Sequence, residues 1–554
     1  MNLKPKLKRF FIFPLIGLLF LVTACGRGTS ENELKVMLGS TVVTLDTAHM
    51  QDSYSFEVVA DCIDGLMQLD EKGNAIPAIA ESFEVSADGK EYTFHLRDAK
   101  WSNGDPVTAH DFVFAWRRHC KIADEYSFIF DSTVACIKNA EAVIKGADPS
   151  TLGVTAKDDK TLVVSLDAPV SFFPALMSFP SFYPINEKFY NSVKEGSYGT
   201  SPDTFISNGA FTLDSYIPGT ANIALKKNES YWDANRVSLN MLRYQVVSSS
   251  DNALTAFKNG TLQVVKIAGE QVEHIKSDSE LSKQLSFIPE GSLYYIAFNQ
   301  DPKNHHGGVL ANVNMRLAIT NAIDRNSLVK NYLMDGSLPT YTAVPQKFSA
   351  NVKTGKFFSE NQDRYKDYVS FNLEKAREHL DKAKKELNRD EFNIHLLYSN
   401  DSGDRITKIV QAVKSQLEAN LPGLTVTLQP VPKAEYLRNF STDNFDIAVA
   451  NWSPDYDDPM TFLNLWTTSN AKSTEYWSSA EYDKIISDCS TDNLAINYDA
   501  RWDAMYKAEK ILFEQAVIAP LFTNTNVILT SPKVSGIEYH TAGVDRVFKS
   551  AKVK

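Results

Sequence analysis

The fifteen residues WSPDYDDPMTFLNLW, from Trp452 to Trp466, place acids beside large aromatic rings. Three of them are carboxylates, at Asp455, Asp457 and Asp458, and both ends are tryptophans. A solvated acidic loop has no need of tryptophan. A buried strand would not tolerate the carboxylates, because an unpaired charge is costly to bury. Neither a plain loop nor a core strand therefore accounts for the stretch.

Metal and catalytic chemistry are the first alternatives for such a group of acids. The spacing of Asp455 and Asp457 resembles a calcium loop, but Pro459 and Met460 stand where an EF-hand needs a ligand and a glycine. The catalytic patterns GxSxG, HExxH, GxxxxGK and GxGxxG are absent from the sequence. The one adjacent pair of histidines, at 305–306, falls in a polar segment that we expect to be a surface loop. We therefore expect no enzyme, metal or cofactor, with a carboxylate-dependent extracellular hydrolase as the alternative from another class.

The first half of the chain carries signals for antiparallel strands. Residues 90–97 alternate between apolar and polar side chains, which is typical of a half-buried strand, and Asp88-Gly89 before them predicts a hairpin turn. Residues 161–166 and 222–228 predict two further strands. We therefore expect this part of the chain to be rich in β-structure.

The second half of the chain has a different pattern. Asn372 is placed to cap a charged helix over 373–387. A strand over 392–398, a helix over 405–421 and a strand over 424–428 then follow. This order predicts a βαβ unit with a parallel pair of strands. The whole chain is therefore expected to have an α/β fold, in which ligands bind at the carboxyl ends of strands or between domains.

The N-terminus carries the pattern of an export signal. Four basic residues precede an unbroken apolar run over 10–22, which is shorter than the roughly 20 residues of a membrane span. The run ends in Leu-Val-Thr-Ala-Cys25, which resembles a bacterial lipobox. We expect a signal peptide over 1–24, and a tether over 25–32 that begins with Cys25 carrying two acyl chains, enough for stable anchoring. The alternative is an ordinary signal peptide in which Cys25 is incidental.

Composition limits the classes of partner. Removal of the signal would bring the formal net charge from −11 to −15, which argues against nucleic acid, because that binding depends on neutralising phosphates. A chain of 554 residues with 43% hydrophobic content is long enough for more than one domain. Cys120 and Cys136 could form a disulfide in an oxidising exterior, or they could be buried free thiols.

Short motifs occur in a consistent order along nearly the whole mature chain. They are TLD (44–46), IDGL (63–66), PAIAES (77–82), YTFHLR (92–97), KWSNG (100–104), NGAF (208–211), NESYWD (228–233), ALTAFKNG (253–260), AIDR (322–325) and WSPDYDDP (452–459). Together they resemble the oligopeptide-binding lipoproteins of ABC transporters, which are extracellular solute-binding proteins of family 5. Any one motif would be a weak signal, and the set is specific because of its order.

The resemblance implies a two-lobed, periplasmic-binding-protein-like α/β fold of the large peptide-binding type. Lobe I would combine 33–65, 205–290 and 521–554, an inserted β-rich subdomain would fill 66–204, and lobe II would run over 291–520. The chain would then cross twice between the lobes, which suits a hinge.

The resemblance also implies a function. Such a protein is a monomer that captures oligopeptides between its lobes and delivers them to an ABC permease, held at the extracytoplasmic face of the cell membrane by its lipid anchor. A receptor for one signalling peptide, such as a pheromone, is the alternative within the same fold.

Residues of the binding site follow from the same resemblance. Asp455 is expected to bind the peptide's ammonium end, and the backbone of 450–453 is expected to pair with the peptide. Trp452 and Tyr456 are expected to line the cleft, with ordinary core packing as the alternative, and Asp457 and Asp458 to serve as turn or helix-capping residues. The full set of expected ligand-binding residues is Asp455, Ser453, Trp452, Asn451, Ala450, Tyr456, Asp52, Ser53 and Tyr54.

One position departs from the resemblance. Enteric oligopeptide-binding proteins have an arginine that can bind the ligand carboxylate just before the equivalent of 450–453, and this chain has Val449 there. An ion-pair anchor for short peptides of fixed length is therefore not expected at this position. Longer peptides, or a carboxylate end left in solvent, fit the sequence better, with Arg438 or Lys433 as substitutes.

Overall fold

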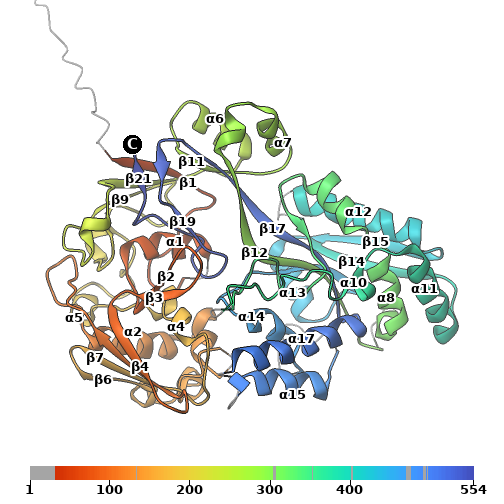
Figure 1. Cartoon of the computed structure of the whole chain (residues 1–554), viewed down its shortest axis with the longest axis horizontal. Helices are drawn as coiled ribbons and strands as arrows, with labels where there is room; N and C mark the ends of the chain where they lie inside the picture. The colour runs from red at the N-terminus through yellow and green to blue at the C-terminus, as the bar shows by residue number, and fades with distance from the viewer. Residues whose placement is uncertain are drawn as a thin grey trace, which may run out of the picture.

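A computed structural model describes residues 32–554, apart from 51, 133, 304–306, 352–353, 401–403, 469–475, 491–493 and 496. The described residues form two lobes around one large mixed sheet of eleven strands (Figure 1). Its strands run in the order β15-β14-β16-β12-β17-β11-β1-β10-β9-β8, and β13 (Leu338–Pro339) pairs with β17 off this path. None of the helices in the described part is long and apolar enough to cross a membrane.

Lobe I contains one end of the large sheet. Its strands are β1 (Glu33–Leu38), β8 (Phe211–Ser215), β9 (Asn222–Lys227), β10 (Met241–Val246) and β11 (Val264–Ile267). β1 lies parallel to both β10 and β11. The main helices of lobe I are α1 (Ser53–Cys62), α6 (Ser250–Lys258) and α7 (Glu270–Ser277).

Lobe II contains the other end of the sheet. β14 (Phe392–Ser399) and β15 (Leu424–Val431) are parallel and joined by α12 (Asp404–Asn420), which confirms the predicted βαβ unit. α11 spans Leu373–Leu387 as predicted, and the Asn372 side chain accepts a hydrogen bond from the Lys375 N–H. Apolar side chains of α8 (Val313–Asn321), α11 and α12 pack with those of the strands in one core. The lobe also contains α13 (Lys433–Ser441), β16 (Ile447–Trp452), α14 (Met460–Leu463), α15 (Ala480–Cys489) and α17 (Tyr498–Glu514).

Two long strands connect the lobes. β12 (Leu285–Phe298) and β17 (Ile518–Thr530) pair with each other and run from one lobe into the other (Figure 1). β17 pairs with β11 in lobe I, and β12 pairs with β16 in lobe II. The register of the β12–β17 pair shifts between Pro289 and Leu293, next to the predicted lobe boundary at 290/291.

The inserted segment forms its own antiparallel sheet in the order β4-β5-β7-β6. Its strands are β4 (Ala80–Val85), β5 (Glu91–Leu96), β6 (Val154–Asp158) and β7 (Thr161–Ser165), with α2 (Ala109–Ile122) beside them. A small hairpin, β2 (Met67–Leu69) and β3 (Ala75–Pro77), precedes the sheet. The strands predicted over 90–97, 161–166 and 222–228 are confirmed as β5, β7 and β9.

The alternative of a disulfide between Cys120 and Cys136 is wrong. Both are free and buried, as are Cys62 and Cys489. The Cys136 thiol donates a hydrogen bond to the Ser132 carbonyl at 3.3 Å. Burial raises the pKa of Cys120 and of Cys136 to about 12, so both are neutral thiols that pack as small apolar groups.

Candidate functional site

A cavity of about 130 Å³ lies where β12, α1, the loop after β16 and the C-terminal segment meet. Its walls come from lobe I, the inserted segment, lobe II and the C-terminal segment. The lining residues are Ser53, Phe56, Tyr126, Phe179, Glu290, Ser292, Ser453, Pro454, Asp455, Thr541, Ala542, Gly543 and Asp545. The structure therefore brings three predicted residues, Ser53, Ser453 and Asp455, around one cavity between the lobes.

Asp455 is placed at the cavity by the loop that follows β16. Its backbone N–H donates to the Thr461 hydroxyl at 3.3 Å, which ties the loop to α14. Two residues earlier, the Ser453 hydroxyl lies 2.8 Å from the Ser292 hydroxyl of β12. These contacts fix the loop between the strand it leaves and the helix it enters, so the Asp455 carboxylate has a defined position at the cavity wall.

The end of β16 that leads to Asp455 is paired with another strand on one side only. β12 pairs with the whole strand, from Leu293↔Trp452 to Phe298↔Ile447. On the other side, the pairing with β14 ends at Leu397↔Ala448. In the described part of the chain no strand pairs with residues 450–452 on this side. Such an edge can accept an extended peptide by strand addition.

The predicted residues of lobe I have separate roles. Asp52 is the N-cap of α1, and its carboxylate accepts hydrogen bonds from the Ser55 N–H at 2.9 Å and from the Ser55 hydroxyl at 2.7 Å. Ser53 lines the cavity directly. Burial, and then the nearby Asp545 and Glu290 carboxylates, raise the pKa of Tyr54, which places its hydroxyl in an acidic environment. Asp52 thus holds the helix from which Ser53 reaches the cavity.

The predicted aromatic residues of lobe II are packed rather than open to the cavity. Tyr456 is buried and stacks on Phe172 of the inserted segment, with ring centroids 4.4 Å apart and planes at 9°. The Trp452 indole N–H donates to the Thr461 hydroxyl at 3.4 Å. Neither residue is among those that line the cavity. The burial and stacking of Tyr456 favour the core-packing alternative, and its ring joins the inserted segment to lobe II.

The two acids after Tyr456 hold the loop. Asp458 accepts from the Met460 N–H at 3.0 Å, which confirms the predicted turn role, although the N-cap of α14 itself is Pro459. Asp458 also forms a two-pronged ion pair with Arg501 at 2.6 and 2.9 Å. Asp457 caps no helix. Burial, and then the charge of Asp458, raise its pKa to about 7, and its Oδ2 lies beside Gly73 in the turn between β2 and β3.

Sequence reasoning missed the residues that come to the cavity from strand β12 and the C-terminal segment. Gly291 has a φ of +78° within the irregular part of β12, and a Cβ there would collide with the Thr541 carbonyl oxygen. This local geometry turns the neighbouring Glu290 toward the cavity. The run Pro289-Glu290-Gly291 inside a long strand was the available signal, because proline and glycine in a strand mark a bulge or a close backbone approach.

The cavity is acidic. Asp455, Glu290 and Asp545 line it, and none of the described lining residues is a lysine, arginine or histidine. Glu290 lies 3.6 Å from the half-exposed Lys266 ammonium. Burial, followed by the charges of Glu290 and Glu57, raises the pKa of Asp545 to about 7. Such a site is suited to a cation, and in the described residues no group of acids, histidines and cysteines could hold a metal ion.

Val449, the residue that departs from the family pattern, has a packing role. The Val449 side chain is buried in the apolar core of lobe II, and its carbonyl accepts from the Tyr436 hydroxyl at 3.0 Å. Arg438, proposed above as a substitute, is largely exposed on α13 and pairs with Glu435. Among the described residues that line the cavity, there is no cation for a peptide carboxylate.

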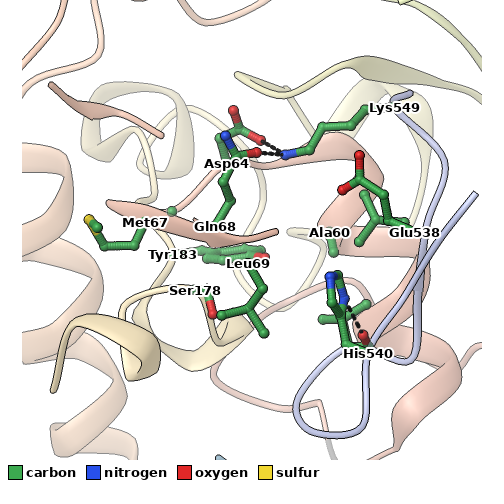
Figure 2. Close-up of a pocket in the computed structure, with 13 residues that line it drawn as sticks. Ala60, Asp64, Met67, Gln68, Leu69, Ser178, Tyr183, Glu538, His540 and Lys549 are labelled. Carbon is green, nitrogen blue, oxygen red and sulfur yellow. Dashed lines mark hydrogen bonds and ion pairs between the residues drawn. The ribbon is translucent and has the colours of Figure 1, made fainter. Parts of the chain in front are cut away.

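A second cavity, of about 30 Å³, lies inside lobe I and is structural (Figure 2). Lys549 points at Asp64, with Nζ 3.6 Å from Oδ1, and Asp64 also accepts from the Tyr231 hydroxyl and the Trp232 indole N–H. The cavity has room for about one water molecule. This buried network ties the C-terminal segment to the loop after α1 and to the segment after β9.

Comparison with known proteins shows that this fold and site are those of two-lobed solute-binding proteins. Residues 74–474 match the model of bacterial extracellular solute-binding proteins, family 5 (middle region). The chain belongs to this family of solute-binding proteins, as predicted.

Relatives cover nearly all of the chain. It is 32% identical over 549 residues to a dipeptide-binding protein of Lactococcus lactis, which covers 96% of this chain and 97% of that protein. The solved structure of Listeria monocytogenes OppA bound to peptide matches with a TM-score of 0.76 at 31% identity, over 95% of this chain and 100% of that one. The pheromone receptor PrgZ matches with a TM-score of 0.77 at 31% identity, over the same shares. These likenesses confirm the predicted two-lobed α/β fold.

Proposed function

We propose that this protein captures oligopeptides between its lobes and delivers them to an ABC permease. The observation that carries the proposal is the unpaired edge of residues 450–452, which leads straight to an acidic cavity lined by Asp455. An extended backbone and a free ammonium are what all peptides share. The printed names of the relatives, a dipeptide-binding protein and a peptide-bound OppA, support the same ligand class.

Binding would use generic features of the peptide. The backbone adds as a strand along 450–452, and the ammonium end meets Asp455, which fixes the register. The charge-assisted hydrogen bond is strong because the closed cleft is largely dry. Since a ligand stabilises only the conformation to which it binds more tightly, the closed form becomes dominant when peptide is bound, and the permease would recognise that form.

Anchoring at the outer face of the membrane completes the proposal. Cys25 would be the lipidated N-terminus of the mature chain, and 25–32 the tether that lets a monomer reach its permease. These residues, like the predicted signal peptide over 1–24 and the histidine pair at 305–306, lie outside the residues that the structure describes, except Asn32.

A titration with peptides of graded length tests the ligand class. We expect broad binding of unrelated free-amine peptides, measured by intrinsic fluorescence and calorimetry. One tight ligand among many non-binders would instead favour a signalling receptor, the alternative suggested by the likeness to PrgZ. Failure of every peptide to bind, or hydrolysis of a peptide that stops in Asp455→Asn, would contradict the proposal.

A further inference from the structure

The acidic cavity has one aromatic wall. The rings of Phe56, Tyr126 and Phe179 line it and contact one another, with centroids 5.1 to 5.8 Å apart. Phe56 meets the other two rings edge to face. Aromatic faces attract cations, and the apolar stems of lysine and arginine pack well against such rings. The wall is thus suited to a side chain with an apolar stem and a cationic head.

The three carboxylates of the lining come from other segments than the aromatic rings. Glu290 is held by the Ser292 hydroxyl at 3.0 Å and by Lys266 at 3.6 Å. Asp545 has no hydrogen bond from its side chain among those found in the described residues, and the adjacent Arg546 is paired with Glu57 at 2.7 Å. The irregular stretch of β12 at Gly291 packs against Pro454 and Thr541, so these carboxylates come from segments in mutual contact.

The charges in the cavity distinguish Asp455, which would bind the peptide ammonium, from Glu290 and Asp545. A peptide ammonium at Asp455 supplies one positive charge to a cavity in which no described lining residue is basic. Glu290 and Asp545 then remain in the same cavity. The partly exposed Lys266 ammonium offsets only part of their negative charge. A second positive charge on the ligand, close to its ammonium, would compensate them.

We propose that Glu290 and Asp545 are specificity residues that favour peptides with lysine or arginine at the first position. The stem of that side chain packs on Phe56, Tyr126 and Phe179, and its head lies at the two carboxylates. The first residue is the one concerned because its ammonium binds Asp455 in the same cavity of about 130 Å³. This inference rests on the proposed function and names the substrates of that site more narrowly.

The test compares two peptides that differ only at the first position, lysine against norleucine, which has a similar apolar stem but no charge. Calorimetry with the full-length chain should show the lysine peptide binding about 10-fold tighter, the range of a hydrogen bond to a charged group. In Glu290→Gln and in Asp545→Asn this ratio should fall toward one. Glu273→Gln, an exposed acid of α7 paired with Lys276, is the matched control and should keep the ratio.

Each outcome decides the matter. Equal affinity of the two peptides for the wild-type protein would overturn the inference without any variant, and so would a ratio that survives both substitutions. In either case peptide binding itself persists and the proposed function stands. If neither peptide binds, the proposed function is wrong and this inference falls with it.

Discussion

Asp455, Asp457 and Asp458 lie within four residues of one another, yet each has its own environment. Asp458 is neutralised by Arg501, Asp457 is buried against the turn between β2 and β3, and Asp455 lines the cavity. Sequence reasoning distinguished an acid predicted to bind the ligand, Asp455, from two acids predicted to hold a turn or cap a helix. It could not find Arg501 or Glu290, because these partners come from elsewhere in the chain and no local pattern connects them.

Loss of Arg501 should destabilise the protein strongly. Its guanidinium and the Asp458 carboxylate are 2% and 5% exposed, so Arg501→Ala leaves a buried charge without a partner. We expect the free energy of unfolding to fall by about 3–5 kcal/mol, measured by urea denaturation. Lys484→Ala, which breaks the exposed pair with Asp488, is the control and should cost at most about 1 kcal/mol. Equal, small losses in both variants would show that the buried pair does not hold the loop.

Asp545 should make stability depend on pH. Its pKa is raised from 3.8 to about 7, so between these values the folded state binds more protons than the unfolded state, and stability falls as pH rises. Burial is the main cause of the raised pKa, the charges of Glu290 and Glu57 add to it, and Lys266 and Arg546 oppose it. Asp545→Asn removes the titration, so its Tm relative to the wild type should increase from pH 5 to pH 8 in the peptide-free protein. A Tm difference that is constant over this range would contradict the environment described for Asp545.

At the scale of elements, local pattern predicted much of the fold. The cap and bounds of α11 and the β14-α12-β15 unit follow from side-chain periodicity and one asparagine, since both act within a few residues. The irregular part of β12 did not follow from the sequence. Its geometry depends on the close contact between Gly291 and the Thr541 backbone, which lies about 250 residues further along the chain. Such a long-range contact leaves no periodic pattern in the sequence.

The contact between the inserted segment and lobe II should stabilise the closed form. Phe172→Ala removes a stacked ring pair that contributes about 0.5–1.5 kcal/mol beyond its burial, so peptide affinity should fall by about 2- to 10-fold, mainly through faster dissociation. Stopped-flow fluorescence measures this rate. Phe83→Ala is the control, because the Phe83 ring contacts Tyr92 and Phe94 within the inserted sheet. Dissociation that changes equally in both variants would argue against a role for Phe172 in closure.

For the whole molecule, β12 and β17 join the two lobes (Figure 1), and two connecting strands suit a hinge. Residues on both sides of this connection line the cavity. The division of the chain into segments 33–65, 205–290 and 521–554 against 291–520 stays a prediction, and both strands run through its boundaries. The sequence indicated this arrangement only through the ordered set of motifs, because hydrophobic periodicity says nothing about how distant segments assemble.

Anchoring is tested at the level of the whole protein. Cys25→Ala removes the residue that would carry the acyl chains, so the protein should leave the membrane fraction and appear in the medium or the soluble exported fraction. Immunoblotting of fractionated cells measures the distribution. Retention of the variant in the membrane fraction would contradict the lipid anchor.

The ammonium site at Asp455 is tested most directly by a double comparison in a calorimeter. Wild-type protein and Asp455→Ala are each titrated with one peptide in its free-amine and N-acetylated forms. The substitution should cost the free-amine peptide about 2–5 kcal/mol, the range for breaking a buried charge pair, and should cost the acetylated peptide far less. Equal losses for the two forms would show that Asp455 does not bind the ammonium end.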